Sequence, residues 1–384
     1  MTFFKQRGTV MQSKNQISDD AKAVLKALAT RKNVIVAGPP GTGKSRLLNE
    51  VREAFQWKVS STGSSPFAAV PIPAATAPIP SWFPSPDRTR SREVFPTVFD
   101  QNTKYRDFVR GLVPKVGQAG AFEVTEGTMY RASMHAVESG NAALVIVDEI
   151  NRGPAVAAFG SSLVGLEADK RLLEDGTESS TTQYFEILGD QGQSQQFALP
   201  ADLYVLAAMN EADTSVEPLD VAFLRRFHQY RLEPDVDILR SHLGLVPENT
   251  ENLGNLPAAA SSSLDYYEAL TQAFKKVNER IELGRGQAYQ LGHGALMHRE
   301  VSTSGIDVAR EYITEAWSTL RAHVDEVFYG NTQAISDLLW AESSHSPYRL
   351  KIETFAGQTV RRIVGPLRPE PDQLYALLRT IATG

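Results

Sequence analysis

The residues best suited to chemistry lie in one glycine-rich stretch, VAGPPGTGKSRLLNE, at positions 36–50. Gly38, Gly43, Lys44 and Ser45 fill the pattern G-x-x-x-x-G-K-[ST]. In loops of this pattern the backbone N–H groups surround phosphate oxygens, the lysine neutralises the β- and γ-phosphates, and the hydroxyl ligates Mg²⁺. We therefore predict a site for a nucleoside triphosphate with Mg²⁺. The predicted nucleotide-binding residues are Gly38, Pro39, Pro40, Gly41, Thr42, Gly43, Lys44, Ser45 and Arg46.

A phosphate loop alone holds a nucleotide, whereas hydrolysis needs groups directed at the γ-phosphate. In VIVDEINRG, Asp148 ends a second apolar run and is predicted to hold Mg²⁺ together with Ser45. Glu149 follows directly and is predicted to activate the attacking water as a general base. Asn210, in AAMNEADTS after a third apolar run, is predicted to sense the γ-phosphate. Together with Lys44, these catalytic residues predict an enzyme, a nucleoside triphosphatase.

Two further catalytic candidates, Arg225 and Arg226, lie in EPLDVAFLRRFHQYRLEP near the end of a short predicted helix. A guanidinium at this position can reach into a nucleotide site. Because the chain already supplies its own lysine and Mg²⁺ ligands, we predict that this pair acts in trans, as an arginine finger in the next subunit's site. That prediction requires a ring. The spacing alone also fits a surface pair that bridges to acidic side chains.

The elements that must position these groups are readable from hydrophobic patterning. NVIVA at 33–37 predicts a buried strand, and KSRLLNEVREAF at 44–55 carries apolar residues at helical spacing. AALVIV at 142–147 and LYVLAA at 203–208 predict two more buried strands, each followed at once by polar residues. A helix beginning at Ser18, capped by that serine, precedes the first strand. The pattern predicts an α/β fold with a mostly parallel sheet and functional groups at the strand ends.

The domain organisation follows from shifts in composition. We expect a flexible leader over 1–17, an α/β core over 18–230, and a smaller helical lid over 231–340. Within the core, repeated prolines at about 60–97 disfavour helix and central strand, so this stretch is predicted to be a surface insertion. Residues 341–384 are predicted to form a C-terminal extension with a short hairpin and a last helix, and we consider it and the insertion as candidates for partner docking.

Composition limits the function classes. The chain has 384 residues, 42% of them hydrophobic and 22% charged, which is ordinary for a globular protein. No run reaches the ~18 apolar residues of a membrane span, and no signal peptide is recognisable, so we expect a cytoplasmic location without membrane contact. The absence of cysteine excludes disulfides, thiol catalysis and cysteine-based zinc sites. A net charge of -6 argues against a strong non-specific DNA binder.

Four motifs, GPPGTGKS, DEINRG, MNEADTS and LRRF, occur in an order that resembles AAA+ modules, and more narrowly the McrB-type NTPases of modification-dependent restriction systems. KYRDFVRGLVP, LGRGQAYQLGHG and VDEVFYGNTQAISDLL resemble further segments of that family. The resemblance implies a homo-hexameric ring that commonly uses GTP, is stimulated by a nuclease-bearing partner of the McrC type, and helps to translocate DNA. By this resemblance the chain is a motor subunit of an anti-phage defence complex.

The resemblance also extends to single residues. It implies functional roles for Asn151 and Asp213, in addition to the residues named above. Arg152 follows the DEIN motif, where it either contacts a ring neighbour or is a surface charge. His293, in LGHGA, matches a histidine of the family's lid, for which we expect a structural role.

The chain departs from the family pattern at three positions. Glu211 stands where the family usually has threonine, Thr214 where it has arginine, and Leu224 where a third arginine often precedes the pair. The chain therefore has fewer arginines near the predicted γ-phosphate position than the resemblance implies.

The sequence leaves the choice of base and two alternative functions open. No N-K-x-D or T-K-x-D motif for guanine recognition occurs, so the prediction of GTP as substrate depends on the resemblance alone. ATP is the more common substrate of AAA+ proteins. Neither a nuclease motif nor room for a DNA-reading domain before the first helix is recognisable, so we expect partners to read and cut DNA. The alternatives are a MoxR-like ATPase that remodels a protein and a nucleotide-gated scaffold. Glu149 argues against the scaffold, which needs no water-activating carboxylate.

Overall fold

The computed structural model describes residues 17–56, 79–213, 219–245, 256–301 and 305–384. The predicted leader up to residue 16, the part of the proline-rich insertion up to residue 78, and Thr214 lie outside the described residues. The chain divides into two compact units. One contains the chain up to Ala37 together with Lys44–Arg231, and the other contains Gly38–Gly43 together with Leu232–Gly384.

The first unit is built on a five-stranded sheet in the order β2-β5-β8-β1-β9. The pairs β2–β5, β5–β8 and β1–β9 are parallel, which confirms the predicted α/β fold with a mostly parallel sheet. Apart from polar residues at their ends, the inner strands are apolar, because both faces of the sheet are covered by helices. The strands are β1 (Asn33–Gly38), β2 (Ser91–Val98), β5 (Asn141–Asp148), β8 (Leu203–Asn210) and β9 (His228–Arg231).

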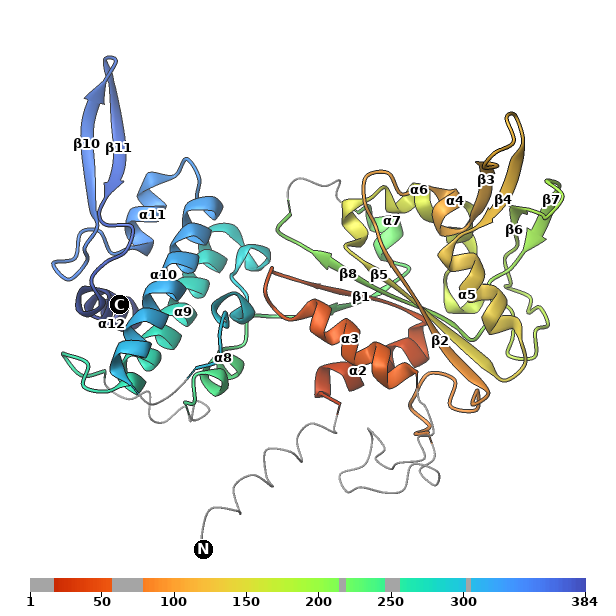
Figure 1. The fold of residues 1–384 in the computed structure, drawn as a ribbon, viewed down its shortest axis with the longest axis horizontal. Helices are drawn as coiled ribbons and strands as arrows, with labels where there is room; N and C mark the ends of the chain where they lie inside the picture. Colours follow the sequence, from red (N-terminus) through yellow and green to blue (C-terminus); the bar gives the residue numbers. More distant parts are fainter. Residues whose placement is uncertain (1–16, 57–78, 214–218, 246–255, 302–304) are drawn as a thin grey trace, which may run out of the picture. The chain divides into compact units, whose positions relative to one another are not determined.

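Helices cover both faces of this sheet (Figure 1). One face carries α2 (Asp19–Arg31) and α3 (Lys44–Phe55), and α2 begins as predicted, with the Ser18 hydroxyl accepting the Ala21 N–H at 3.1 Å. Alternate strand residues, including Ile35, Val145 and Val205, form the core under the other face. The helices there are α4 (Tyr105–Phe108), α5 (Thr128–Val137), α6 (Ala155–Phe159) and α7 (Val221–Leu224).

The end of the predicted proline-rich insertion is part of the sheet, which corrects the expectation of a surface excursion over 60–97. Its last residues form β2, and Pro96 is tolerated because β2 is an edge strand with one side free of ladder hydrogen bonds. Arg92 is buried and donates to the Phe55 carbonyl at 2.9 Å and to the Pro84 carbonyl at 2.7 Å. These bonds hold residues 79–92 onto the α/β unit.

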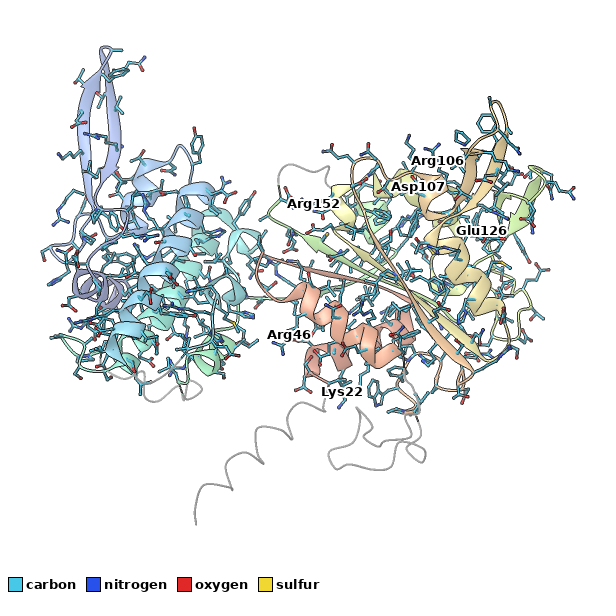
Figure 2. All side chains as sticks on the ribbon, viewed as in Figure 1. Lys22, Arg46, Arg106, Asp107, Glu126 and Arg152 are labelled. Carbon is cyan, nitrogen blue, oxygen red and sulfur yellow. The ribbon has the colours of Figure 1, made fainter. Side chains whose placement is uncertain are left out.

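Two antiparallel hairpins extend from the same unit, and neither was predicted. One pairs β3 (Arg110–Pro114) with β4 (Phe122–Glu126), and the other pairs β6 (Phe185–Leu188) with β7 (Ser194–Phe197). The buried Arg110 guanidinium joins them, because it bonds the Tyr130 hydroxyl at 3.0 Å and the Asp190 carboxylate in the β6–β7 turn. Figure 2 labels Glu126, which lies 3.5 Å from the same guanidinium.

The second unit is a helical bundle with one projecting hairpin (Figure 1). The hairpin pairs β10 (Arg349–Phe355) with β11 (Gln358–Val364), as predicted. Helix α12 shares one hydrophobic core with α9 and α10, so residues 341–384 do not form a separate structural unit. No helix of the described ranges has the length and apolarity to cross a membrane. The helices are α8 (Val236–His242), α9 (Ser263–Arg285), α10 (Ile306–Val327), α11 (Thr332–Leu338) and α12 (Pro371–Thr383).

Candidate active site

The predicted catalytic groups of the α/β unit follow the carboxyl ends of neighbouring strands. Asp148 ends β5 and Asn210 ends β8, and these two strands pair in parallel. Strand β1 lies next to β8 in the sheet, and its chain continues through the glycine loop to Lys44, the first residue of α3. Because the carboxyl ends of parallel strands meet at one edge, the fold brings these groups together.

A cavity of about 240 Å³ opens between α3 and the strands β2 and β5. Ser45 and Asp148 both line it, together with Asn49 of α3 and Thr97 of β2. A hydroxyl and a carboxylate facing one cavity suit Mg²⁺, which prefers oxygen ligands, keeps several waters, and takes the rest from substrate phosphates. Within the described residues no group of three or more His, Asp or Glu side chains could hold a metal alone. The geometry fits a metal shared with a bound nucleotide.

Glu149 is held by its neighbours from several sides. Its backbone is left-handed, with φ 53° and ψ 42°, a conformation that costs a non-glycine residue energy and often marks functional sites. Its N–H donates to the Asp148 carboxylate at 3.0 Å. The Asn210 amide donates to both Glu149 carboxylate oxygens, at 3.1 and 3.2 Å. The amide predicted to sense the γ-phosphate therefore contacts the predicted general base.

Arg152, labelled in Figure 2, ties the loop after β5 to the end of β8. Its guanidinium lies 3.2 Å from the Glu149 carboxylate and 3.4 Å from that of Asp213. The Asn151 amide donates to the Asn210 carbonyl at 2.9 Å in the same region. The sequence left Arg152 as a neighbour contact or a surface charge, and the structure adds a contact inside its own subunit.

Lys44 is surrounded by acidic groups. Burial lowers the pKa of its ammonium to about 8, against the opposing effect of Glu149, Glu211 and Asp148. Glu211 in turn accepts from Arg231, at the end of β9, at 3.0 Å. The glutamate that departs from the family pattern thus pairs with an arginine that sequence reasoning did not single out. No local pattern in the sequence marks Arg231, because β9 is defined by its pairing with β1.

The two consecutive arginines after α7 have different surroundings. Arg226 donates from Nε to the Leu163 carbonyl at 3.0 Å and lies 4.0 Å from Glu167, so it is tied to its own subunit. Arg225 is exposed, and its side chain has no partner among the residues that the structure describes. Of the pair, only Arg225 is available to reach another chain.

The predicted phosphate loop has the backbone that its glycines allow. Gly41 and Gly43 have φ of 80° and 88°, in the left-handed region that favours glycine. The Thr42 hydroxyl is buried and donates to the Pro39 carbonyl at 2.9 Å. Arg46, labelled in Figure 2, is exposed on α3, and the structure gives it no specific contact with the loop.

Comparisons with known proteins agree with the motifs. Residues 87–227 match the family model described as AAA domain, dynein-related subfamily. The chain is 27% identical over 279 residues to the Type IV methyl-directed restriction enzyme EcoKMcrB subunit of Escherichia coli K12, covering 71% of this chain and 49% of that protein. It is 26% identical over 216 residues to the Type II restriction enzyme BsuMI component YdiS of Bacillus subtilis 168, covering 53% of this chain and 57% of that protein.

The chain thus spans about half the length of the curated relatives it matches. Among solved structures, a putative ATPase from Cytophaga hutchinsonii is 15% identical with a TM-score of 0.33, covering 87% of this chain and 84% of that one. Similarity at that level supports no conclusion about function.

Proposed function

This chain is an McrB-like AAA+ protein, and from that premise we propose that it is the motor subunit of a DNA restriction complex that defends against phage. In this proposal it forms a homo-hexameric ring in the cytoplasm and hydrolyses GTP or ATP with Mg²⁺. Hydrolysis drives DNA translocation, while a separate McrC-like nuclease subunit cuts. DNA is contacted through partners. The names of both relatives as restriction-enzyme components support the restriction role.

One observation carries the hydrolytic function: Lys44, Asp148, Glu149 and Asn210 meet at one edge of the sheet, with Glu149 held by the Asn210 amide. A protein that only holds nucleotide has no need of this carboxylate. In the proposed reaction Glu149 takes the proton of the water that attacks the γ-phosphorus, while the bond to the bridging oxygen breaks.

The other residues bind and neutralise the substrate in this proposal. Lys44 neutralises the β- and γ-phosphates, and Ser45 and Asp148 hold Mg²⁺, which supplies charge neutralisation when bound. Asn210 moves from Glu149 to the γ-phosphate when nucleotide is present, which releases the base. Arg225 reaches the neighbouring subunit's site. Arg226, which donates to the Leu163 and Ala222 carbonyls, anchors the segment that carries Arg225.

The test is steady-state hydrolysis of GTP and ATP, side by side, at several protein concentrations. We expect turnover that rises more steeply than the protein concentration, because a shared site forms only in the ring. Glu149→Gln keeps the size of the side chain and one acceptor oxygen but cannot take the proton, so it should lower turnover about 10³-fold while nucleotide still binds.

The outcomes separate the candidate functions. Turnover that Glu149→Gln leaves intact in both nucleotides would refute the assigned base. Robust ATP hydrolysis that is independent of concentration, DNA and a nuclease subunit would favour a MoxR-like ATPase that remodels a protein. Nucleotide binding without any turnover would favour a nucleotide-gated scaffold.

A further inference from the structure

A short segment of the helical unit lies against loop residues of the same unit and donates two backbone hydrogen bonds to them. We call Gly292–Gly294 the glycine strut. The Gly292 N–H donates to the Pro40 carbonyl at 2.9 Å, and the Gly294 N–H donates to the Gly41 carbonyl at 2.8 Å. Two successive loop carbonyls are therefore satisfied by one segment some 250 residues further along the chain.

The backbone of Gly292 lies so close to the phosphate loop that only glycine fits at this position. A Cβ added to Gly292 would overlap the Gly41 carbonyl group and the Thr42 nitrogen, which are backbone atoms that cannot turn aside. The φ of Gly292 is -69°, a value that any residue adopts, so conformational freedom does not explain this glycine. A Cβ on Gly294 would lie 2.8 Å from the Gly41 oxygen alone, a milder conflict. Close approach to the loop is the remaining reason for both glycines.

The strut is fixed firmly to the helical bundle on each side. Asn278 of α9, itself buried, bonds both backbone groups of Leu291, donating to its carbonyl at 3.0 Å and accepting its N–H at 2.8 Å. His293 is buried, and its Nδ1 accepts the Asp235 N–H at 3.1 Å, at the start of α8. The Tyr312 hydroxyl of α10 donates to the Leu296 carbonyl. Three helices thus fix the segment that touches the loop.

The direction of these bonds explains what the strut does. A phosphate loop binds anions with its N–H groups, so its carbonyls must point away from the phosphate and find other donors. Pro40 and Gly41 accept from the strut, which fixes the orientation of the peptide groups that carry the following N–H donors at Gly41 and Thr42. Ordering the loop before the nucleotide arrives removes an entropy cost from binding.

We propose that Gly292 and Gly294 are positioning residues that hold the phosphate loop in its anion-binding conformation from the helical unit. This inference rests on the proposed function, because it assumes that the loop binds nucleoside di- and triphosphates. It adds that the loop's shape is set by α8, α9 and α10 through the strut. The helical unit, which contains Gly38–Gly43 as well as the strut, then determines the conformation of the loop.

The experiment compares the full-length protein with Gly292→Ala, Gly294→Ala and Gly284→Ala. The last is a matched control in α9 of the same unit, where the added Cβ meets only the Phe328 ring, at 3.0 Å. The probes are fluorescent analogues of GDP, GTP, ADP and ATP, titrated well below the unfolding temperature of each variant. Thermal unfolding without nucleotide is measured in parallel.

We expect Gly292→Ala to weaken binding of the di- and triphosphate of the preferred base about tenfold, since a loop hydrogen bond is lost. Gly294→Ala should weaken it less, and Gly284→Ala should leave it unchanged. Wild-type affinity for a folded Gly292→Ala protein would overturn the inference, as would equal losses in Gly292→Ala and Gly284→Ala. If Gly292→Ala does not fold, an unchanged affinity in Gly294→Ala overturns it instead. A wild-type protein that binds none of the four probes would refute the proposed function.

Discussion

In the proposed function, the carboxyl edge of the sheet and the glycine strut contribute to nucleotide chemistry by different physical means. The edge works through side chains: an ammonium at Lys44, a carboxylate at Glu149 and an amide at Asn210. The strut works through the backbone N–H groups of two glycines, which donate to two loop carbonyls. Charge and proton transfer need particular side chains, whereas loop shape needs only close approach and hydrogen bonds.

This difference predicts that substitutions in the two regions should affect different measured quantities. Changes at the sheet edge should alter turnover and its pH dependence, and changes in the strut should alter affinity for phosphate. Substitutions that reverse this division would show that the two regions do not have separate roles.

Arg225→Ala should lower turnover about 10³-fold with little change in nucleotide affinity, because an arginine finger stabilises charge that develops only in the transition state. The measurement is hydrolysis at saturating nucleotide, beside a titration with a fluorescent analogue. Arg226→Ala is the matched variant: it loses the bond to the Leu163 carbonyl and should cost about 1 kcal/mol of unfolding free energy.

Mixing shows whether Arg225 acts in trans. Subunits carrying Arg225→Ala, inactive alone, are mixed with subunits carrying Lys44→Ala, also inactive alone. In a mixed ring some sites combine an intact Lys44 with an intact Arg225 from the neighbour, so activity should partly return. No recovery at any ratio, with mixed assembly verified, would place the Arg225 function within its own subunit.

Nucleotide affinity should fall as the pH rises through the pKa of Lys44. Burial sets that pKa at about 8 in the nucleotide-free protein, and only the protonated ammonium attracts phosphate. Affinity is therefore fully present below this pKa and is lost above it, by about eightfold between pH 7.5 and 9. The assay is the fluorescent titration repeated across this range. In Lys44→Arg the nucleotide affinity should not change with pH, because a guanidinium stays charged across this pH range.

An equal pH dependence in Lys44→Arg would assign the titration to another group. Gly292→Ala should lower affinity at every pH without moving the midpoint, because the two hydrogen bonds from the strut to the loop join backbone groups, which do not titrate. A shifted midpoint would mean that the strut also controls the environment of Lys44.

Much of the sheet edge could be predicted from the sequence because its signals are local. The apolar runs that became β5 and β8 end in Asp148 and Asn210, the polar residues of the candidate site, and the glycine motif after β1 fixes the start of α3. Strand β9, with the sequence HQYR, was missed because it is short and polar and is defined by pairing with β1. Strand β2 was missed because Pro96 is compatible only with an edge position, which composition does not reveal.

The contacts between distant residues could not be predicted in the same way. Glu211 was noted as a departure from the family pattern, but its pairing with Arg231 depends on β9 lying at the edge of the sheet. Gly292 and Gly294 resemble ordinary loop glycines in the sequence. Their role depends on an approach to Gly41 across most of the chain, which no local pattern encodes.

Arg152 contacts the predicted base, and we expect it to take no direct part in the reaction. Its guanidinium is about half exposed and occupies a Glu149 carboxylate oxygen that Asn210 also contacts. An exposed pair of this kind contributes about 0.5 kcal/mol. Arg152→Ala should therefore free Glu149 and raise the rate of nucleotide hydrolysis, measured without a nuclease subunit or DNA, about twofold. Arg152→Lys, which keeps the charge, should stay near wild type. A fall in turnover with Arg152→Ala would instead show that this arginine works on a reacting phosphate, in its own site or in a neighbour's. Mixing with Lys44→Ala subunits would then separate those two cases, because only a residue acting in trans regains activity in a mixed ring.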